Sequence, residues 1–363
     1  MNNRISELRV AVYTIPTDAA ESDGTLEWTD TTMVVVRVRA GDLEGIGYTY
    51  GNAAIKPFIL SMLGPMVIGR SATDVTLLQT EMIARIRNEG QCGMAMMAVS
   101  AVDIALWDLK AKVLELPLYR LLGEVRSSVP IYGSGGFTSY TEDQLHDQLQ
   151  GWVQGGINAV KIKVGRDSAA DFVRVNAARE AIGKDAALFV DANGAYSVND
   201  ALRQAERFSV YGVNWLEEPV VATNLLQLKF IREQLPAAIR LVAGEYCYGL
   251  DDFRGLLEAH AVDILQADVT RCGGITGFIK AGHLAEAFHI PLSSHCAPSA
   301  HLHAAMALSS FSIAEYFHDH VRIEEQFFDG FSRPREGCLY PDGNRNGLGL
   351  VFREAEAEAF RVA

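Results

Sequence analysis

From residue 129 onward the chain alternates short apolar segments with helical ones, and this alternation constrains the fold more than any other feature. Eight segments are typical of buried strands: 129–133, 160–164, 188–193, 214–219, 241–245, 262–268, 291–295 and 313–317. Helical patterns lie between most of them, at 141–155, 169–182, 198–211, 225–235, 252–259 and 277–288. Eight strands of this kind predict a parallel (β/α) barrel. An open doubly wound sheet is the alternative, but it usually has fewer strands and a glycine-rich phosphate fingerprint, which is missing here.

The first 128 residues follow a different pattern. Apolar and β-branched runs at 6–13, 31–38 and 45–50 are typical of antiparallel strands, and helical patterns follow at 56–68, 75–88 and 94–114. We therefore predict an α+β domain at 1–128 and a barrel at 129–335. The segment 336–363 is rich in Gly, Asp and Arg, and we expect it to pack back on the N-terminal domain.

Composition excludes several classes of partner. The 363 residues are 49% hydrophobic and 21% charged, and the formal charge of −13 disfavours nucleic acid or an anionic membrane surface as partner. No apolar run is long enough to cross a bilayer, and the start of the chain lacks the apolar core of a secretory signal, so we expect a cytoplasmic protein. The five cysteines have no CxxC spacing, which predicts buried free thiols.

Ionisable residues stand at the ends of seven successive predicted strands, where a parallel barrel carries its functional groups. They are Lys161, Lys163, Asp191, Glu217, Glu245, Asp268, His295 and Glu315. Strands buried on both faces should be apolar, so a series of this kind indicates a functional site rather than helix capping.

Three of the carboxylates, Asp191, Glu217 and Glu245, come from adjacent strands and form a set of oxygen ligands. Such a set suits Mg²⁺ better than Zn²⁺. Strand alternation lets only one of Glu217 and Glu218 face inward, without saying which. With Mg²⁺ and two lysines the site has a net positive charge, which predicts binding of a substrate carboxylate and removal of a proton from the adjacent carbon.

The remaining residues supply acids and bases. Lys161 and Lys163 share one face of a strand, and their repulsion and loss of hydration predict a lowered pKa for at least one of them. Asp268 would orient the imidazole of His295, which becomes a second base. Glu315 would act best when protonated, donating a hydrogen bond to the developing enolate.

This series resembles the enolase superfamily, and the Lys-x-Lys pair with the His/Asp dyad resembles its mandelate racemase group. The likeness extends to Ala105–Lys110 and Pro117–Gly123 in the N-terminal domain. It implies a (β/α)₇β barrel under an α+β capping domain, with Asp191, Glu217 and Glu245 as Mg²⁺ ligands. It further implies Lys163 as one acid/base, Lys161 as a contact to the substrate carboxylate, the Asp268–His295 dyad opposite, Glu315 as enolate stabiliser, and a homo-oligomer. Enolase-superfamily sites in general use a Lys or His base with Mg²⁺ to stabilise the intermediate, and this series fits that description.

Substrate specificity rests on the cap. An acidic loop at 17–24, with Asp18, Glu21 and Asp23, fits a hydroxyl-rich substrate and disfavours a second carboxylate. The alternative is that this loop is only solvated surface and does not contact the substrate. The sequence leaves open whether Tyr48 and Tyr50 contact the substrate or only pack against neighbouring residues. Two roles are also open for Arg271: a place in the pocket or a salt bridge.

We therefore expect a Mg²⁺-dependent dehydratase that converts a mono-acid sugar to a 2-keto-3-deoxy acid. The same two bases would also serve a racemase, an epimerase or a cycloisomerase, including one acting on a sugar lactone or an anhydro-sugar acid. A Schiff-base aldolase and a non-catalytic sugar-acid binder are the remaining alternatives.

Overall fold

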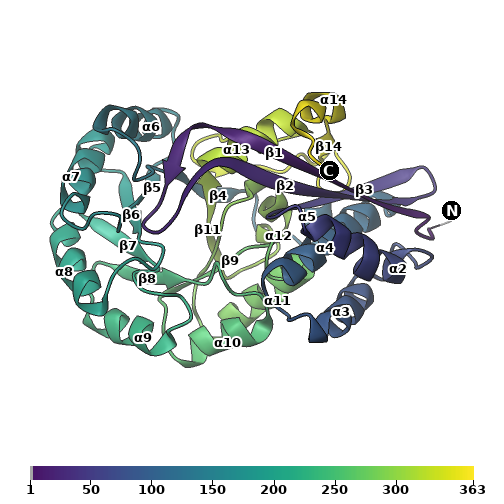
Figure 1. Ribbon diagram of the computed structural model, residues 1–363, viewed down its shortest axis with the longest axis horizontal. Helices are drawn as coiled ribbons and strands as arrows, with labels where there is room; N and C mark the ends of the chain where they lie inside the picture. Colours follow the sequence, from purple (N-terminus) through teal and green to yellow (C-terminus); the bar gives the residue numbers. More distant parts are fainter. Residues whose placement is uncertain (1–2) are drawn as a thin grey trace.

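The computed structural model describes residues 3–363, and its centre is a closed barrel of eight parallel strands (Figure 1). The barrel closes because its last strand, β11 (Phe311–Phe317), pairs in parallel with its first, β4 (Val129–Gly135). Between them lie β5 (Ala159–Lys163), β6 (Ala187–Asp191), β7 (Val213–Glu217), β8 (Arg240–Ala243), β9 (Ile264–Ala267) and β10 (Leu292–Ser294). The predicted barrel is confirmed.

A ring of helices covers the outside of the barrel (Figure 1). They are α6 (Glu142–Gln154), α7 (Asp171–Ile182), α8 (Val198–Ser209), α9 (Leu225–Gln234), α10 (Leu250–Glu258), α11 (Gly274–Ala287), α12 (Pro298–Ala305) and α13 (His318–Phe327). The sequence analysis missed the last two. All eight residues of α12 are buried, so it has no polar face to reveal a helical period, and α13 follows β11 without a connecting loop.

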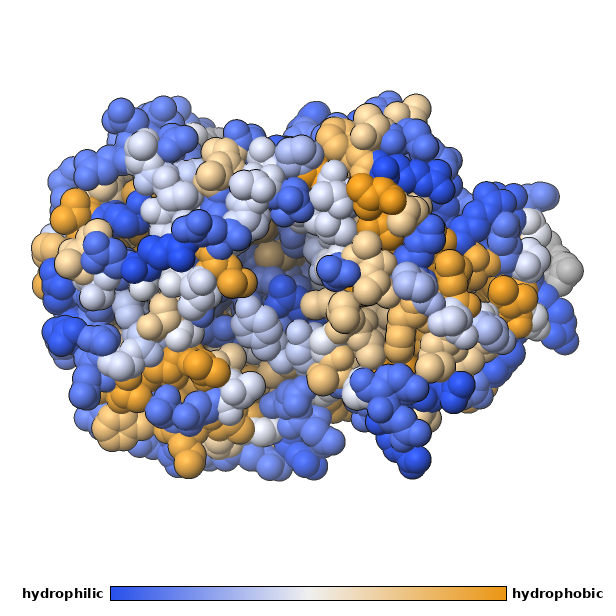
Figure 2. Space-filling model, in the orientation of Figure 1, coloured by the Kyte–Doolittle hydropathy of each residue, from blue (hydrophilic) through white to orange (hydrophobic). Residues whose placement is uncertain are grey.

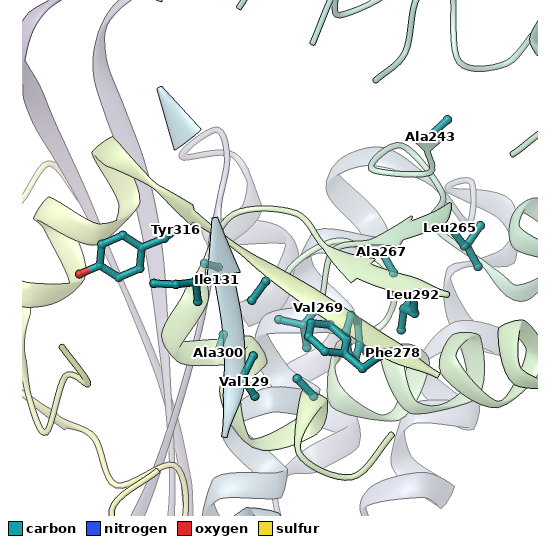
Figure 3. Packing of buried hydrophobic residues seen from close by; sticks show 14 of the residues in the cluster. Val129, Ile131, Ala243, Leu265, Ala267, Val269, Phe278, Leu292, Ala300 and Tyr316 are labelled. Atoms are coloured by element: carbon teal, nitrogen blue, oxygen red, sulfur yellow. The ribbon is translucent and has the colours of Figure 1, made fainter. Parts of the chain in front are cut away.

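Side chains that point outward from the strands pack against these helices. Figure 3 shows this core with Val129 and Ile131 on β4, Leu265 on β9, and Phe278 reaching in from α11. Since successive side chains of a strand face opposite ways, the alternate residues point into the barrel. On β5 this places Val160 and Ile162 in the core and directs both lysines to the interior.

The N-terminal part forms a three-stranded antiparallel sheet with helices on one side. The strands are β1 (Glu7–Ser22), β2 (Glu27–Ala40) and β3 (Leu43–Tyr50). The helices are α1 (Ile55–Phe58), η1 (Ile59–Leu63), α2 (Gly64–Val67), α3 (Val75–Arg85), η2 (Ile86–Asn88), α4 (Gly93–Val113) and α5 (Leu118–Leu122). Helix α4 lies directly on β3, where a Cβ at Gly47 would stand 2.2 Å from the Ala101 carbonyl oxygen.

The predicted acidic loop at 17–24 is wrong in its conformation. Most of it belongs to β1, which pairs with β2 on both sides of a register shift between Pro16 and Glu21. Only the residues from Asp23 to Leu26 form the turn of this long hairpin, which crosses the end of the barrel (Figure 1). Polar and small residues obscured the strand, which can carry them because β1 is the edge strand of the sheet and pairs there with β2 alone.

The C-terminal segment runs back along both parts. It contains β13 (Cys338–Leu339), antiparallel to β4, and β14 (Val351–Phe352), which pairs with β12 (Phe328–Asp329). Then α14 (Glu354–Ala357) and η3 (Glu358–Phe360) lead to backbone hydrogen bonds between Val12 and the final residues, Val362 and Ala363. We propose the division 1–128, 129–335 and 336–363 for cap, barrel and returning segment.

Within residues 3–363, every helix is too short or too polar to cross a bilayer. All five cysteines are free thiols, but only Cys247, Cys272 and Cys296 are buried as predicted; Cys92 is exposed and Cys338 is partly buried.

Candidate active site

A cavity of about 250 Å³ lies between the β1–β2 hairpin and the carboxyl ends of the barrel strands. Figure 2 shows a hollow on this face beside the hairpin, with hydrophilic side chains along its rim. Five of the predicted site residues line the cavity: Lys163, Glu245, Asp268, His295 and Glu315. Lys161, Asp191 and Glu217 lie directly beneath, where they contact these residues and each other.

Each predicted metal ligand is paired with a cationic side chain. Lys163 Nζ lies 2.5 Å from Asp191 Oδ2, and Lys161 Nζ lies 2.6 Å from Glu217 Oε1. His295 Nε2 lies 3.0 Å from Glu245 Oε2. All three carboxylates are buried, so these pairs offset charges that would otherwise be costly to desolvate.

The lysine pKa values run opposite to the sequence prediction. Burial alone would lower the pKa of Lys161, but the carboxylates of Glu217 and Glu315 outweigh burial and raise it well above its usual value. For Lys163, burial and the charge of Lys161 would lower the pKa, but Asp191, Glu315 and Glu245 together outweigh them and raise it. The prediction considered only the repulsion between the two lysines. It did not take into account the carboxylates from neighbouring strands. Their attraction for each ammonium group is larger than the repulsion between the two lysines.

His295 and Asp268 form the predicted dyad. His295 Nδ1 lies 2.8 Å from Asp268 Oδ2, while Asp268 Oδ1 accepts hydrogen bonds of 2.7 Å from both the backbone N–H and the hydroxyl of Thr270. Burial would raise the pKa of Asp268, but the hydrogen bond and charge of His295 lower it to about 2. The carboxylate is therefore an anion that fixes one ring nitrogen of His295.

Glu315 is ionised in this arrangement, contrary to the expectation that it would be protonated. Its Oε1 accepts a hydrogen bond of 2.6 Å from Ser134 Oγ and lies 2.8 Å from Lys161 Nζ, and its Oε2 accepts one from the Cys296 N–H. Burial would raise the pKa of Glu315, but the positive charges of Lys161, His295 and Lys163 together outweigh it and lower the pKa.

The donor set fits Mg²⁺. Asp191, Glu217 and Glu245 offer oxygen ligands alone, and two further buried oxygens nearby in the chain, Asn193 Oδ1 and Glu218 Oε1, have no hydrogen-bond partner. In the structure each of the three carboxylates lies against its own cationic partner, and the three do not converge on one point. Among residues 3–363, two groups of three potential metal-ligating residues have ligand atoms that all lie within 4.8 Å of one another: His295–Cys296–Glu315 and Asp18–Glu21–His318.

The backbone at these ligands is specialised. Gly244, just before Glu245, has a φ of 137°, and a Cβ there would meet the Gln266 carbonyl oxygen at 2.1 Å. Glu218, just after Glu217, has a φ of 36°. These left-handed conformations turn the chain sharply at the strand ends, so that the carboxylates point into the barrel mouth.

Of the cap residues left open by the sequence, some line the cavity and others do not. Asp23 and Tyr50 line it, whereas Tyr48 is fully buried and donates a hydrogen bond to Glu324. Glu21 is buried and accepts a hydrogen bond from Trp28, and Asp18 pairs with His318 at the surface.

Arg271 satisfies both earlier interpretations. It lines the cavity, and its guanidinium also lies 3.5 Å from Asp268 Oδ2 and 3.6 Å from Glu245 Oε1. Its charge is therefore largely committed to the site's own carboxylates.

Among the cavity residues that sequence reasoning did not single out are Asn193, Cys296 and His320. Asn193 and Cys296 are each one or two positions past a predicted site residue, so their closeness to Asp191 and His295 was available as a signal. His320 lies in a helix that the sequence did not predict, and no local pattern singled it out.

A parallel barrel under an antiparallel cap, with buried carboxylates, two lysines and a His/Asp pair around one cavity, defines a class: the enolase superfamily. The comparisons agree. Residues 144–356 match the family model described as enolase C-terminal domain-like, and residues 15–123 match the N-terminal domain of mandelate racemase / muconate lactonizing enzyme. The chain belongs to the mandelate racemase / muconate lactonizing enzyme family.

Two curated relatives cover almost the whole chain. The 3,6-anhydro-alpha-L-galactonate cycloisomerase of Streptomyces coelicolor is 31% identical over 92% of this chain and 96% of its own length. The L-talarate/galactarate dehydratase of Salmonella typhimurium is 32% identical over 90% of this chain and 82% of its own length.

Solved structures resemble the fold closely. A mandelate racemase/muconate lactonizing enzyme-like protein from Rubrobacter xylanophilus has 47% identity and a TM-score of 0.97, covering 99% of this chain and 100% of that one. A mutant of the Salmonella dehydratase, solved with Mg and L-glucarate, has 28% identity and a TM-score of 0.91, covering 99% of this chain and 92% of that one. Magnesium is thus present in a homologous structure.

Proposed function

We propose that this protein is a Mg²⁺-dependent dehydratase that acts on a mono-acid sugar and produces a 2-keto-3-deoxy acid. The observation that carries the proposal is the placement of Lys163 and His295. Their strands, β5 and β10, lie three positions apart around the barrel in one direction and five in the other, and both side chains line the same cavity. A substrate held in that cavity would therefore have a base on each face of its α-carbon.

The chain's own residues would divide the work. Mg²⁺, held by Asp191, Glu217 and Glu245, would supply the positive charge that acidifies the carbon next to a carboxylate. Lys161 would contact the substrate carboxylate. Glu315, which is ionised beside Lys161, would have to take up a proton before it could donate a hydrogen bond to the oxygen on which charge develops. Ser134 and Cys296 hold Glu315 in that place.

Proton transfer would then proceed in two steps. Lys163 or His295 removes the α-proton, and the other residue, in its protonated form, gives a proton to the β-hydroxyl, which leaves as water. The resulting enol rearranges to the 2-keto acid. Burial would lower the pKa of both residues, but the carboxylates around Lys163, and Cys296 and Glu245 beside His295, outweigh it and raise the pKa, so both residues are protonated in this arrangement. A bound cation would offset the carboxylate charges.

The preference for a mono-acid follows from charge at the distal end of the cavity. Asp23 and Asp30 line it there on the cap hairpin, and Arg271 is engaged by Asp268 and Glu245. A second substrate carboxylate would thus meet like charges without a free counter-charge. The cytoplasmic location and the homo-oligomer stay predictions.

A second candidate, a racemase, epimerase or cycloisomerase, is supported by the same opposed bases. Protonation of the enolate on the other face would invert the carbon, and one relative is a cycloisomerase of an anhydro-sugar acid. This candidate needs no departing hydroxyl.

One experiment separates the two. The protein is incubated in D₂O with Mg²⁺ and a pool of sugar acids, and the products are analysed by mass spectrometry and proton NMR. A 2-keto-3-deoxy acid supports dehydration and identifies the sugar. Deuterium at the α-carbon without loss of water contradicts dehydration and favours the second candidate.

A further inference from the structure

His320 is a buried histidine that faces the cavity and has no part in the chemistry above. It lies in the first turn of α13, just beyond β11, and is 8% exposed. Its ring stacks on the ring of Tyr50 from the cap, with centroids 3.4 Å apart and an interplanar angle of 16°. Phe317 packs against it edge-on at 5.1 Å.

Hydrogen bonding identifies which ring nitrogen of His320 carries its proton. Nδ1 accepts a hydrogen bond of 3.2 Å from the backbone N–H of Ala297, so the proton of the neutral ring is on Nε2. Burial, followed by the nearby positive charge of His295, lowers the pKa of His320 to about 3, which keeps the ring neutral. Within residues 3–363, no group forms a hydrogen bond with Nε2.

The surroundings hold the imidazole in place before any substrate arrives. Tyr50 extends its hydroxyl to 3.4 Å from Glu324 Oε1, which also accepts a 2.7 Å hydrogen bond from Tyr48. The other oxygen of Glu324 accepts a hydrogen bond from the Ser299 N–H. This network joins the cap sheet to α12 and α13. His320 therefore holds its N–H in a fixed position at the contact between the cap and the barrel.

The charges in the cavity indicate what such a donor would bind. A neutral N–H suits a hydroxyl oxygen, and the carboxylates of Asp23 and Asp30 on the same cavity are acceptors for hydroxyl hydrogens. By contrast, the cationic groups Lys161, Lys163 and His295 cluster at the strand ends, where the substrate carboxylate would sit.

We propose that His320 is a specificity-determining residue, whose Nε2–H donates a hydrogen bond to a hydroxyl of the substrate chain distal to the reacting carbon. The substrate class is then a polyhydroxy mono-acid, an aldonic acid, rather than a diacid. This inference rests on the proposed function.

Two substitutions separate substrate binding from support of the fold. His320→Asn retains an acceptor for the Ala297 N–H but removes the distal donor. His320→Gln places an amide N–H close to the position of Nε2 but gives up the acceptor near the backbone. If His320 only supports the fold, the Asn variant should be the less impaired of the two. If His320 binds the substrate, the Gln variant should bind it more tightly than the Asn variant.

Binding is measured by calorimetry on the Mg²⁺-loaded protein. The probes are glycolate, which has no hydroxyl beyond its α-carbon, and three aldonates: D-gluconate, D-galactonate and L-arabonate. Galactarate, which differs from galactonate only in its second carboxylate, tests the substrate class, and Mg²⁺ alone tests the integrity of the metal site.

We expect the tightest aldonate to lose about three- to tenfold in affinity in His320→Asn, which is the range for one neutral hydrogen bond. Glycolate and Mg²⁺ should bind both variants as they bind the wild type, and His320→Gln should recover most of the aldonate affinity. Galactarate should bind the wild type more weakly than galactonate.

Three results would overturn the inference: unchanged aldonate affinity in His320→Asn, an equal loss for glycolate and aldonate, or wild-type aldonate binding no tighter than glycolate binding. Tighter binding of galactarate than of galactonate would overturn the aldonic-acid class. Failure of every acid to bind, glycolate included, would contradict the proposed function, and the inference would fall with it.

Discussion

His295 Nδ1 lies 2.8 Å from Asp268 Oδ2, and the other oxygen of that carboxylate is held by two hydrogen bonds from Thr270. This anchoring matters because a histidine base works only when its reactive nitrogen faces the substrate in the right tautomer.

Asp268→Asn should slow turnover by about 10²- to 10⁴-fold while the fold persists. The Asn carbonyl can still accept from Thr270, but its NH₂ would face His295 Nδ1 and impose the opposite tautomer. Steady-state kinetics on the substrate identified in D₂O would measure the loss, with circular dichroism as the control for folding. A variant with wild-type kcat would show that Asp268 does not orient the base.

Lys163→Ala and His295→Asn should each abolish dehydration, because the proposed reaction needs both an acid and a base. Exchange of the α-proton should respond differently, since one base remains in each variant. We expect each variant to retain exchange with only one configuration at the α-carbon. Proton NMR in D₂O on a pair of α-epimeric sugar acids measures this, and wild-type dehydration in either variant would contradict the mechanism.

Glu217→Gln should weaken Mg²⁺ binding more than Glu218→Gln. Glu217 points into the barrel, where it accepts a hydrogen bond of 2.9 Å from Trp215 Nε1 and pairs with Lys161. Glu218 is a matched control, because it is equally buried and adjacent in sequence. Calorimetric titration of the metal-free proteins gives both affinities, and removal of Mg²⁺ with EDTA should abolish turnover in the wild type. A larger effect at Glu218 would exchange the two assignments.

The stability of the protein should fall as pH rises from about 4 to about 7, in part because of Asp103. Burial raises the pKa of this α4 carboxyl from 3.8 to about 7, despite hydrogen bonds from Thr276. In that window the unfolded chain has lost a proton that the folded chain keeps, so the free energy of unfolding declines, by about 2–4 kcal/mol in total, and levels off above pH 7.

Asp103→Asn cannot titrate and should lose this part of the slope. Urea unfolding of both proteins at pH 5 and pH 8 gives the change in the free energy of unfolding between the two pH values. The contribution of Asp103 is the difference between this change in the wild type and in the variant. Equal changes would show that Asp103 keeps its usual pKa in the fold.

Gly47→Ala should destabilise the cap severely, because the added Cβ would lie 2.2 Å from a backbone oxygen of α4 that cannot move independently. Gly151→Ala is the matched control: it lies in α6, and no atom comes within 4 Å of an added Cβ. We expect the control to be neutral or more stable by about 0.5–1 kcal/mol. Thermal unfolding of both variants gives the comparison, and a mild loss at Gly47 would mean that α4 shifts away from β3.

Much of the site could be predicted because strand alternation is a local property. Once β5 is identified, Lys161 and Lys163 must face the barrel interior, and the other strand-end residues follow by the same reasoning. The role of Glu315 could not be settled in this way. Its protonation depends on Lys161, which is distant in sequence and lies 2.8 Å away only after the barrel has closed.

Residue spacing was enough to predict the alternation of strands and helices, and with it the barrel, the series of ionisable strand ends and the family resemblance. These features depend on the physical demand that buried strands be apolar. The lysine pKa values, the extension of β1 through the acidic stretch and the stacking of Tyr50 on His320 became visible only in the folded chain. Each of these arises where segments far apart in the chain meet, and pairing energies, burial and charge at such contacts are not encoded in any local pattern.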